Sequence, residues 1–398
     1  MDHFLELTAD SRLHSLLRRD LPQTLWVKGL NIESVDEKTV IKGHFINDRR
    51  EVSLAKMDAG GKIALSFDVL STIKGILLEE YHDGLIPTIE MKLPFNYSRI
   101  PHQIKGVVRN FKLRKLRSKR IDFPSKDLSY PVDWLRRLAE CSDLQAPVKR
   151  KWPNANKAAL VITHDVDTNW IFQNPFWLRR ICDLESKYGL QGAWYCVPQY
   201  SQDKEFEGGA KFLLDIGGEL GCHGYNHDAK FAISQGKEFQ RRLDRVKKFA
   251  EKWNMKGFRS EWLWRSPGFL KEISKNFLYD TSIPSFFSAF TKGSNNGCGT
   301  YLPYFTYGNM VEIPLTIPID ECRYYDHLDA ETFWFQQVKR IKSIFQNGGL
   351  AVICLHPQPH QSANRLSFVA IERALEQITS IPHIWKTTPQ QVARWFVQ

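Results

Sequence analysis

Long apolar segments are missing from this sequence. No run in its 398 residues approaches the roughly 18 apolar residues that a membrane-spanning helix needs. The first residues, MDHFLELTADSRLHSLLRRDL, lack the basic-then-apolar order of an export signal, because acidic residues come first and Arg18 and Arg19 interrupt the apolar positions. Internal repeats and low-complexity tracts are also absent, which excludes a solenoid or a mainly disordered chain. We therefore expect a folded protein of the cytoplasm.

Cysteine is sparse and follows no metal-binding or disulfide pattern. There are seven cysteines, an odd number, and they form no CxxC pair and no zinc-finger spacing. This excludes a disulfide framework of the secreted type and a cysteine-based zinc site. We expect reduced thiols, most of them buried as small hydrophobic side chains.

The sequence does have an excess of positive charge. Its 55 Lys and Arg residues outnumber 44 Asp and Glu residues, which gives a formal net charge of +11. One segment, residues 105–120, contains eight Lys or Arg and no acid, interleaved with apolar residues. It fits a solvated basic face, a surface for anionic lipid or a phosphorylated substrate, or a nucleic-acid contact. The last is least favoured, because the sequence has no nucleic-acid-binding motif.

A change in the pattern of apolar and polar residues along the chain predicts two domains. The segment QAPVKRKWPNANK, residues 145–157, is polar, contains prolines and lacks apolar periodicity, so it marks a boundary. Upstream, residues 22–56 are typical of strands, residues 63–81 of a strand that leads into a helix, and residues 129–144 of an amphipathic helix. We expect residues 1–145 to form a smaller α+β accessory domain, whose role the sequence does not reveal.

Downstream of the boundary, short apolar runs alternate with amphipathic helical segments such as 238–253 and 330–348. This alternation favours parallel strands joined by helices, and 248 residues, 151–398, is close to the usual size of a β/α barrel. In such a barrel the chemistry gathers where strands end and loops begin. The expected strands are AALVIT (158–163), GAWYCVP (192–198), ELGCHG (219–224), KGFRS (256–260), MVEIPLTIP (310–318) and LAVICLH (350–356).

Two polar motifs follow the first and third of these runs. Asp165 and Asp167 form a DxD motif, which fits a metal or catalytic site but also fits acids that cap a turn. His223 and His227 are four residues apart, and Gly224 favours a tight loop there over a helix. The two histidines fit either one metal ion or unrelated loop positions. An aspartate with two histidines would supply three ligands and leave positions open for water and substrate.

Later runs end in further residues that could take part in catalysis or substrate binding. Arg259 lies at the end of the fourth run and could hold a carboxylate ionised. Trp262 and Trp264 lie nearby and could form an apolar wall suited to sugar rings; core packing is the alternative. Asp280 is another acid. His356 ends the last run, where it could donate a proton to a leaving group.

The order THDVD, GCHGYNHD, GFRSEWLW, YDTS and ICLHP resembles the five motifs of the polysaccharide deacetylase superfamily, which includes chitin-oligosaccharide and peptidoglycan deacetylases. The counterparts occur in order over about residues 158–357, and the first two and the last are the most specific. The resemblance implies an α/β fold, a distorted (β/α) barrel with about seven strands, and metal-dependent removal of an acyl group from an N-acyl sugar. It does not extend to residues 1–145.

The resemblance also implies roles for individual residues. Asp165 matches the general base, and Asp167, His223 and His227 match the metal ligands. His356 matches the general acid that protonates the leaving amine. The implied cofactor is a divalent metal, Zn²⁺ first, with Co²⁺, Ni²⁺ and Mn²⁺ as alternatives for such a ligand set.

Arg259 matches the arginine of the third motif. Asp280 matches the acid of the fourth motif, which in the family orients the acid histidine; here it would raise the pKa of His356.

Two departures from the family pattern stand out. Val166 separates the two acids of the first motif, which are usually adjacent, and Glu261 stands near the place of a usual proline. Glu261 therefore puts the groove wall, and with it the substrate, in question.

We interpret the chain as a metal-dependent carbohydrate N-deacetylase. Without an export signal, a lipid- or nucleotide-linked sugar at the inner membrane face is favoured over mature wall polymer, with residues 105–120 in peripheral contact with anionic lipid. Two alternatives stay open: a C–N hydrolase of a small non-sugar amide, and a carbohydrate-binding relative without catalysis. The sequence does not give the oligomeric state.

Overall fold

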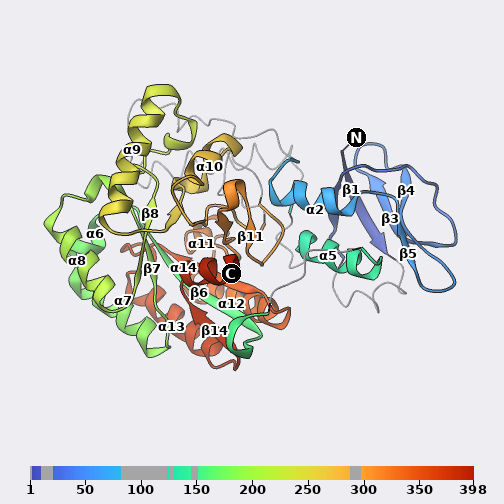
Figure 1. Ribbon diagram of the computed structural model, residues 1–398. Coiled ribbons are helices and arrows are strands. Elements are labelled where there is room, and N and C mark those ends of the chain that lie inside the picture. The colour runs from blue at the N-terminus through green and yellow to red at the C-terminus, as the bar shows by residue number, and fades with distance from the viewer. Residues whose placement is uncertain (1, 10–20, 82–122, 125–129, 145–150, 287–296) are drawn as a thin grey trace.

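The computed structural model describes residues 2–9, 21–81, 123–124, 130–144, 151–286 and 297–398 (Figure 1). The described strands form two separate sheets, one of five strands and one of nine. Figure 1 shows the smaller sheet in blue at one end of the molecule and the larger sheet inside a ring of helices. The basic segment 105–120, predicted as a lipid contact, lies outside the described residues.

The N-terminal sheet is antiparallel and has the order β2-β1-β3-β4-β5. In β1, Leu5 and Leu7 are buried while the residues between and beside them are more exposed, as expected for a sheet with one face on the core. The helices α2 (Val69–Leu77) and α5 (Pro131–Cys141) pack on this face. The strands are His3–Ala9 (β1), Thr24–Val27 (β2), Thr39–Phe45 (β3), Glu51–Met57 (β4) and Ile63–Leu65 (β5).

The larger sheet has the order β11-β12-β10-β9-β8-β7-β6-β13, and β14 also pairs with β6. Seven strands, from β12 to β13 in this order, are parallel, and the short β11 is antiparallel. The strands are Ala158–Val166 (β6), Ala193–Cys196 (β7), Glu219–His223 (β8), Gly257–Arg259 (β9), Tyr279–Asp280 (β10), Tyr304–Phe305 (β11), Val311–Glu312 (β12), Leu350–Leu355 (β13) and Ile384–Thr387 (β14).

Apart from β11 and β14, the strands of this sheet are buried on both faces, which explains their continuous apolar runs. Every residue of β6 and of β13 is buried, and both strands lie in the largest hydrophobic cluster. One predicted strand, 310–318, is wrong in extent: only Val311–Glu312 pairs as a strand. Pro314 and Pro318 lack the N–H that a ladder needs, and beyond Glu312 the run pairs through an isolated bridge between Leu315 and Pro284.

Helices connect and surround the strands (Figure 1). The helix α9 is amphipathic and buries Leu243, Val246 and Phe249. Asp329 caps the start of α12, because its carboxylate accepts from the N–H of Thr332. None of the described helices is long and apolar enough to cross a membrane. The helices of this part are Trp170–Gln173 (α6), Pro175–Lys187 (α7), Lys204–Asp215 (α8), Gly236–Lys252 (α9), Pro267–Ile273 (α10), Cys322–Tyr325 (α11), Ala330–Gln346 (α12), Arg365–Thr379 (α13) and Pro389–Val397 (α14).

The N-terminal part packs on the barrel through the segment that precedes β11. Asp133 of α5 accepts from the hydroxyl of Thr300 at 2.9 Å and from the N–H of Tyr301 at 3.0 Å, and the N–H of Val132 donates to Gly299. Each sheet nevertheless has its own hydrophobic cluster. The division into residues 1–145 and 151–398 stays a prediction, because residues 145–150 lie outside the described part.

All seven cysteines are free, as predicted, and six of them are buried. They contribute small apolar side chains to the interior, and burial raises the pKa of thiols such as Cys354.

Candidate metal centre and active site

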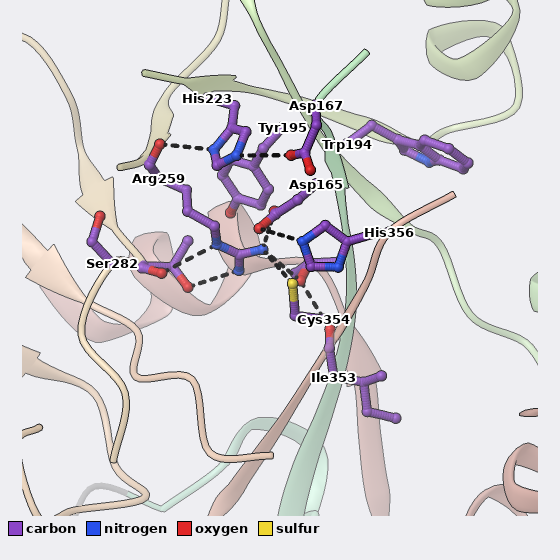
Figure 2. Close-up of polar contacts among 12 residues, drawn as sticks. Asp165, Asp167, Trp194, Tyr195, His223, Arg259, Ser282, Ile353, Cys354 and His356 are labelled. Carbon is purple, nitrogen blue, oxygen red and sulfur yellow. Dashed lines mark hydrogen bonds and ion pairs between the residues drawn. The ribbon is translucent and has the colours of Figure 1, made fainter. Parts of the chain in front are cut away.

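The carboxyl ends of the parallel strands bring the polar motifs together. Asp165 lies in β6 and Asp167 directly follows this strand, while His223, Arg259 and His356 stand at the ends of β8, β9 and β13. Figure 2 shows these side chains converging on one point above the sheet, whereas Trp194 points away from it. Neighbouring parallel strands end at the same edge, which is why residues as far apart in the chain as Asp165 and His356 meet here.

Asp167, His223 and His227 form a compact cluster. Oδ1 of Asp167 lies 3.3 Å from Nε2 of His223 and 3.1 Å from Nε2 of His227, and the three atoms all lie within 4.8 Å of one another. Bonds of about 2.1 Å to one tetrahedral metal ion would place ligand atoms about 3.4 Å apart. The cluster therefore has the dimensions of a site for a divalent metal.

The hydrogen bonds of His223 fix which of its nitrogens faces Asp167. Its Nδ1 lies 3.1 Å from the carbonyl oxygen of Arg259, which can only accept, so Nδ1 carries the proton. In the neutral ring, Nε2 then presents a lone pair to Oδ1 of Asp167. Two electron pairs facing each other repel, and a metal ion between them would satisfy both.

The electrostatics of the trio favour a bound cation. Burial alone would raise the pKa of Asp167, but His227 and His356 beside it hold this pKa well below its usual range. Burial would lower the pKa of His227, but Asp167 outweighs it and raises this pKa to about 9. The negative charge of Asp167 thus attracts positive charge to this place, and a metal ion would take over the role of the proton on His227.

Arg259 holds the carboxylate of Asp165. Its Nη1 donates to Oδ1 of Asp165 at 2.5 Å and to the hydroxyl of Thr163 at 3.0 Å, and its guanidinium lies 4.3 Å from the ring centre of Tyr195. Nε and Nη2 both donate to Thr281, at 3.2 and 3.0 Å. Arg259 is fully buried, so water screens its charge little and its attraction for the carboxylate of Asp165 is strong.

This pairing keeps Asp165 ionised. Burial would raise the pKa of Asp165, but the guanidinium of Arg259, helped by His223 and His356, lowers it below the usual value. Oδ2 of Asp165 is directed away from Arg259 and lies 4.0 Å from Nε2 of His356. Asp165 is thus an oriented, charged carboxylate next to the cluster of Asp167 and the two histidines.

The partner of His356 is Asp320, and the prediction that Asp280 orients this histidine is wrong. Nδ1 of His356 donates to Oδ1 of Asp320 at 2.7 Å, and the backbone N–H of His356 donates to Oδ2 at 2.9 Å. Burial would lower the pKa of His356, but Asp320, together with Asp167 and Asp165, raises it well above its usual value. His356 therefore holds a proton on Nε2 near neutral pH, directed toward the site.

Asp280 belongs to a different group of buried acids. Its carboxylate accepts from the hydroxyl of Ser282 at 2.7 Å and from the N–H of Ser282, and a hydrogen bond joins it to Glu312. Burial raises the pKa of Asp280, and burial and the charge of Asp280 raise that of Glu312 well above its usual value. Asp280 is thus associated with Ser282 and Glu312, whereas Asp320 is the acid that contacts His356.

Glu261 does not open into a groove. It begins a short 3₁₀ turn, Glu261–Leu263, and its carboxylate accepts from backbone N–H groups of the loop that carries His227. Trp262 of the same turn lies beside His227, with ring centres 6.2 Å apart. Trp264, the second ring of the expected apolar wall, is buried and packs with Ala229 and Trp262, as the core-packing alternative predicts. A wall at Trp262 stays a prediction, and the Glu261 carboxylate holds the loop.

Sequence reasoning missed Asp320, although a signal for it exists. Asp320 follows the apolar run 310–318 in the same way as Asp165 follows the run 158–163. The run PLTIP contains two prolines and pairs poorly, but it still enters the barrel, and the N–H of Asp320 donates to Cys354 of β13. Looking for an acid after every apolar run would have identified Asp320, whereas the match to the fourth motif points only to Asp280.

Comparisons with known proteins place the fold. No family model matches the sequence, and no curated protein matches it. Among solved structures, the chain is similar to a Puue allantoinase, with 13% identity, a TM-score of 0.51, and coverage of 70% of this chain and 99% of that one. It is also similar to a protein of Pseudomonas aeruginosa PAO1 described as a probable polysaccharide deacetylase, with 15% identity, a TM-score of 0.50, and coverage of 66% and 97%. The predicted fold is thus confirmed: the chain contains a (β/α) barrel like that of these structures, preceded by a smaller sheet.

Proposed function

We propose that the chain is a metal-dependent hydrolase that removes an N-acetyl group from an amino sugar, in a polymer, an oligosaccharide, or a lipid- or nucleotide-linked form. One observation carries this proposal. A charged carboxylate held by arginine, a protonated histidine held by aspartate, and an Asp-His-His cluster lie at one edge of the barrel. A base, an acid and a metal site are the parts that amide hydrolysis needs.

Asp167, His223 and His227 would hold the divalent metal, whose chemistry is to polarise an amide carbonyl and acidify a water. Asp165 accepts the proton of the attacking water, because Arg259 keeps it ionised and leaves Oδ2 free of that ion pair. Trp262, beside His227, offers a flat apolar surface to a sugar ring.

His356 supplies the proton that the leaving amine requires. Its Nδ1 is committed to Asp320, so the transferable proton is on Nε2, 4.0 Å from Oδ2 of Asp165. After the transfer, Asp320 stabilises the ring's orientation and favours its reprotonation. The proton that Asp165 takes from the water can thus be passed to His356, which restores both groups for the next reaction.

A second candidate is hydrolysis of a C–N bond in a small non-sugar amide. The fold likeness to an allantoinase favours it, because that protein combines a similar barrel with another nitrogen substrate. Both candidates use the same base, acid and metal cluster. They differ in the substrate and in the product released.

Acetate release separates these functions. The purified chain would be stripped of metal, reloaded with Zn²⁺, Co²⁺, Ni²⁺ or Mn²⁺, and assayed over N-acetyl oligosaccharides, sugar nucleotides and lipid-linked N-acetyl sugars. We expect metal-dependent acetate release that is lost in Asp165→Asn and His356→Ala, both with metal content retained. Full activity without metal would overturn the proposal, and hydrolysis of small linear or cyclic amides to the corresponding acid and amine groups, without acetate release from N-acetyl sugars, would favour the second candidate.

A further inference from the structure

Glu261 is the buried acid whose role neither the sequence nor the proposed chemistry explains. We infer that it is a positioning residue: its carboxylate locks the loop of residues 224–229 in the shape that presents His227 to the metal. This inference rests on the proposed metal site and deepens it. It concerns how the site is held ready when no metal is bound.

Four backbone N–H groups of the loop converge on this single carboxylate. Oε1 of Glu261 accepts from Tyr225 at 2.5 Å, from Asn226 at 2.9 Å and from His227 at 2.9 Å, and Oε2 accepts from Ala229 at 2.8 Å. Because both oxygens act as acceptors, the group binds the loop as a carboxylate. Glu261 is only 2% exposed, so water does not compete for these bonds.

The loop needs such an anchor because its backbone is unfavourable on its own. Gly224, His227 and Ala229 have φ values of 60°, 56° and 61°, in the left-handed region. His227 and Ala229 carry a Cβ, which makes this region costly, so surrounding contacts must impose the conformation. The bonds to Glu261 act on the backbone of both residues and therefore fix the direction of the His227 side chain.

The fit between Glu261 and the loop leaves no spare room. A Cβ added to Gly224 would lie 2.1 Å from Cγ and 2.4 Å from Oε1 of Glu261. The glycine thus lets the acid approach the chain closely. A glutamine cannot replace the acid without loss, because its NH₂ group would face at least one N–H donor where the carboxylate has an acceptor.

Arg259 and Glu261 divide the positioning of the site between them. The side chain of Arg259 holds Asp165, and its carbonyl oxygen fixes Nδ1 of His223. Glu261, two residues further on, holds the loop of His227. Loss of the Glu261 carboxylate should therefore release His227 alone, with His223 and Asp165 still in place.

Metal binding tests this role without relying on turnover. Zn²⁺ affinity of the stripped full chain would be measured by competition with a chromophoric chelator, and Co²⁺ absorption would report the ligand set. We expect Glu261→Ala to weaken Zn²⁺ binding by about 10- to 100-fold, the range for residues that support metal ligands, and Glu261→Gln to weaken it less. Both variants should change the Co²⁺ spectrum.

Glu219→Gln is a matched control, because Glu219 is a buried carboxylate on β8 that contacts Tyr279 and the N–H of Gln390 and none of the loop. It should leave Zn²⁺ affinity within about threefold of the unchanged protein. Hydrogen exchange of amides 225–229 should accelerate in the Glu261 variants only. If Glu261→Ala does not fold, Glu261→Gln decides the question.

The failures are distinguishable. Zn²⁺ affinity and loop exchange in both Glu261 variants equal to those of the unchanged protein would overturn this inference and leave the proposed function intact. An unchanged protein that binds no divalent metal would overturn the proposed function. In that case, fast loop exchange in the Glu261 variants would still support the anchor.

Discussion

Arg259 shows how much one side chain organises at this edge of the barrel. Its guanidinium donates to Asp165, Thr163 and Thr281, and its carbonyl oxygen accepts from His223. The planar fork of arginine serves several acceptors in fixed directions, which a lysine cannot do. The identity of this residue, and not only its charge, therefore determines the direction of the proposed base.

Arg259→Lys tests this dependence. Burial favours the neutral form of Asp165 and the guanidinium opposes it, so weakening the ion pair should raise the pKa of Asp165. We expect kcat to fall by about 10²-fold or more and the acidic limb of the kcat/KM profile to move to higher pH. The measurement is a pH profile of acetate release at matched metal content. An unmoved acidic limb would show that Arg259 does not control the base.

Asp320→Asn tests the acid. Burial alone would lower the pKa of His356, and Asp320 is the main group that raises it. Its removal should lower that pKa, so that His356 loses its proton at lower pH. We expect the alkaline limb of the kcat/KM profile to move to lower pH, with activity better retained at pH 6 than at pH 8. Asp280→Asn, the matched control, should not move this limb; the reverse pattern would restore the sequence-based assignment.

Position along the chain predicted which side chains lie close together at the strand ends. Asp167 directly follows β6, His223 ends β8 and His227 lies in the next loop, and their ligand atoms lie within 4.8 Å of one another; their metal binding stays a proposal. Asp280 also follows a strand, but its side chain turns toward Glu312. Side-chain direction at a strand end depends on register between neighbours, which a single sequence does not contain.

At the scale of elements, the apolar runs predicted the strands well and their ends less well. Expected strands 158–163 and 350–356 correspond to β6 and β13, whose burial is complete. The strand β14 went unpredicted, because its four residues, Ile384–Thr387, are only partly buried except at the last position. Pairing with β6 forms it, and such pairing over more than 200 residues leaves no local signal.

The shape of the turn after β8 should depend on Gly224. Gly224 has a φ of 60°, and a Cβ there would overlap Glu261. We expect Gly224→Ala to lower the melting temperature and to weaken Zn²⁺ binding by at least about tenfold, because the loop must move away from its anchor. Gly208→Ala is the control: Gly208 lies within α8 with nothing near its added Cβ, so alanine should maintain or raise stability. Equal Zn²⁺ affinity in both variants would contradict the argument.

At the scale of the whole molecule, buried polar contacts tie the two sheets together. Arg265 of the barrel forms an ion pair with Glu79, which follows α2, and the two side chains are only 2% and 9% exposed. Glu79 also accepts from the N–H of Gly297 at 3.0 Å. These partners are 186 and 218 residues apart, so no sequence pattern predicted the contact.

Glu79→Ala measures the strength of this connection. Removing one partner of a buried ion pair leaves the other charge poorly compensated and typically costs about 3–5 kcal/mol. We expect a clear loss of stability in chemical denaturation, with Zn²⁺ affinity of the folded protein unchanged. Glu6→Ala is the control, because its partner Arg49 is 69% exposed and the pair should contribute little. Equal effects of the two substitutions would mean that the buried pair does not join the two parts.

The contact between α5 and the segment before β11 bears on how this protein can be divided. Thr300 and Tyr301 are 0% and 1% exposed, and Asp133 of α5 satisfies both. A barrel produced from residue 151 onward would lack α5 and would expose these groups to water. The two parts are therefore expected to fold as one cooperative unit, and a fragment that contains the barrel alone should be less soluble.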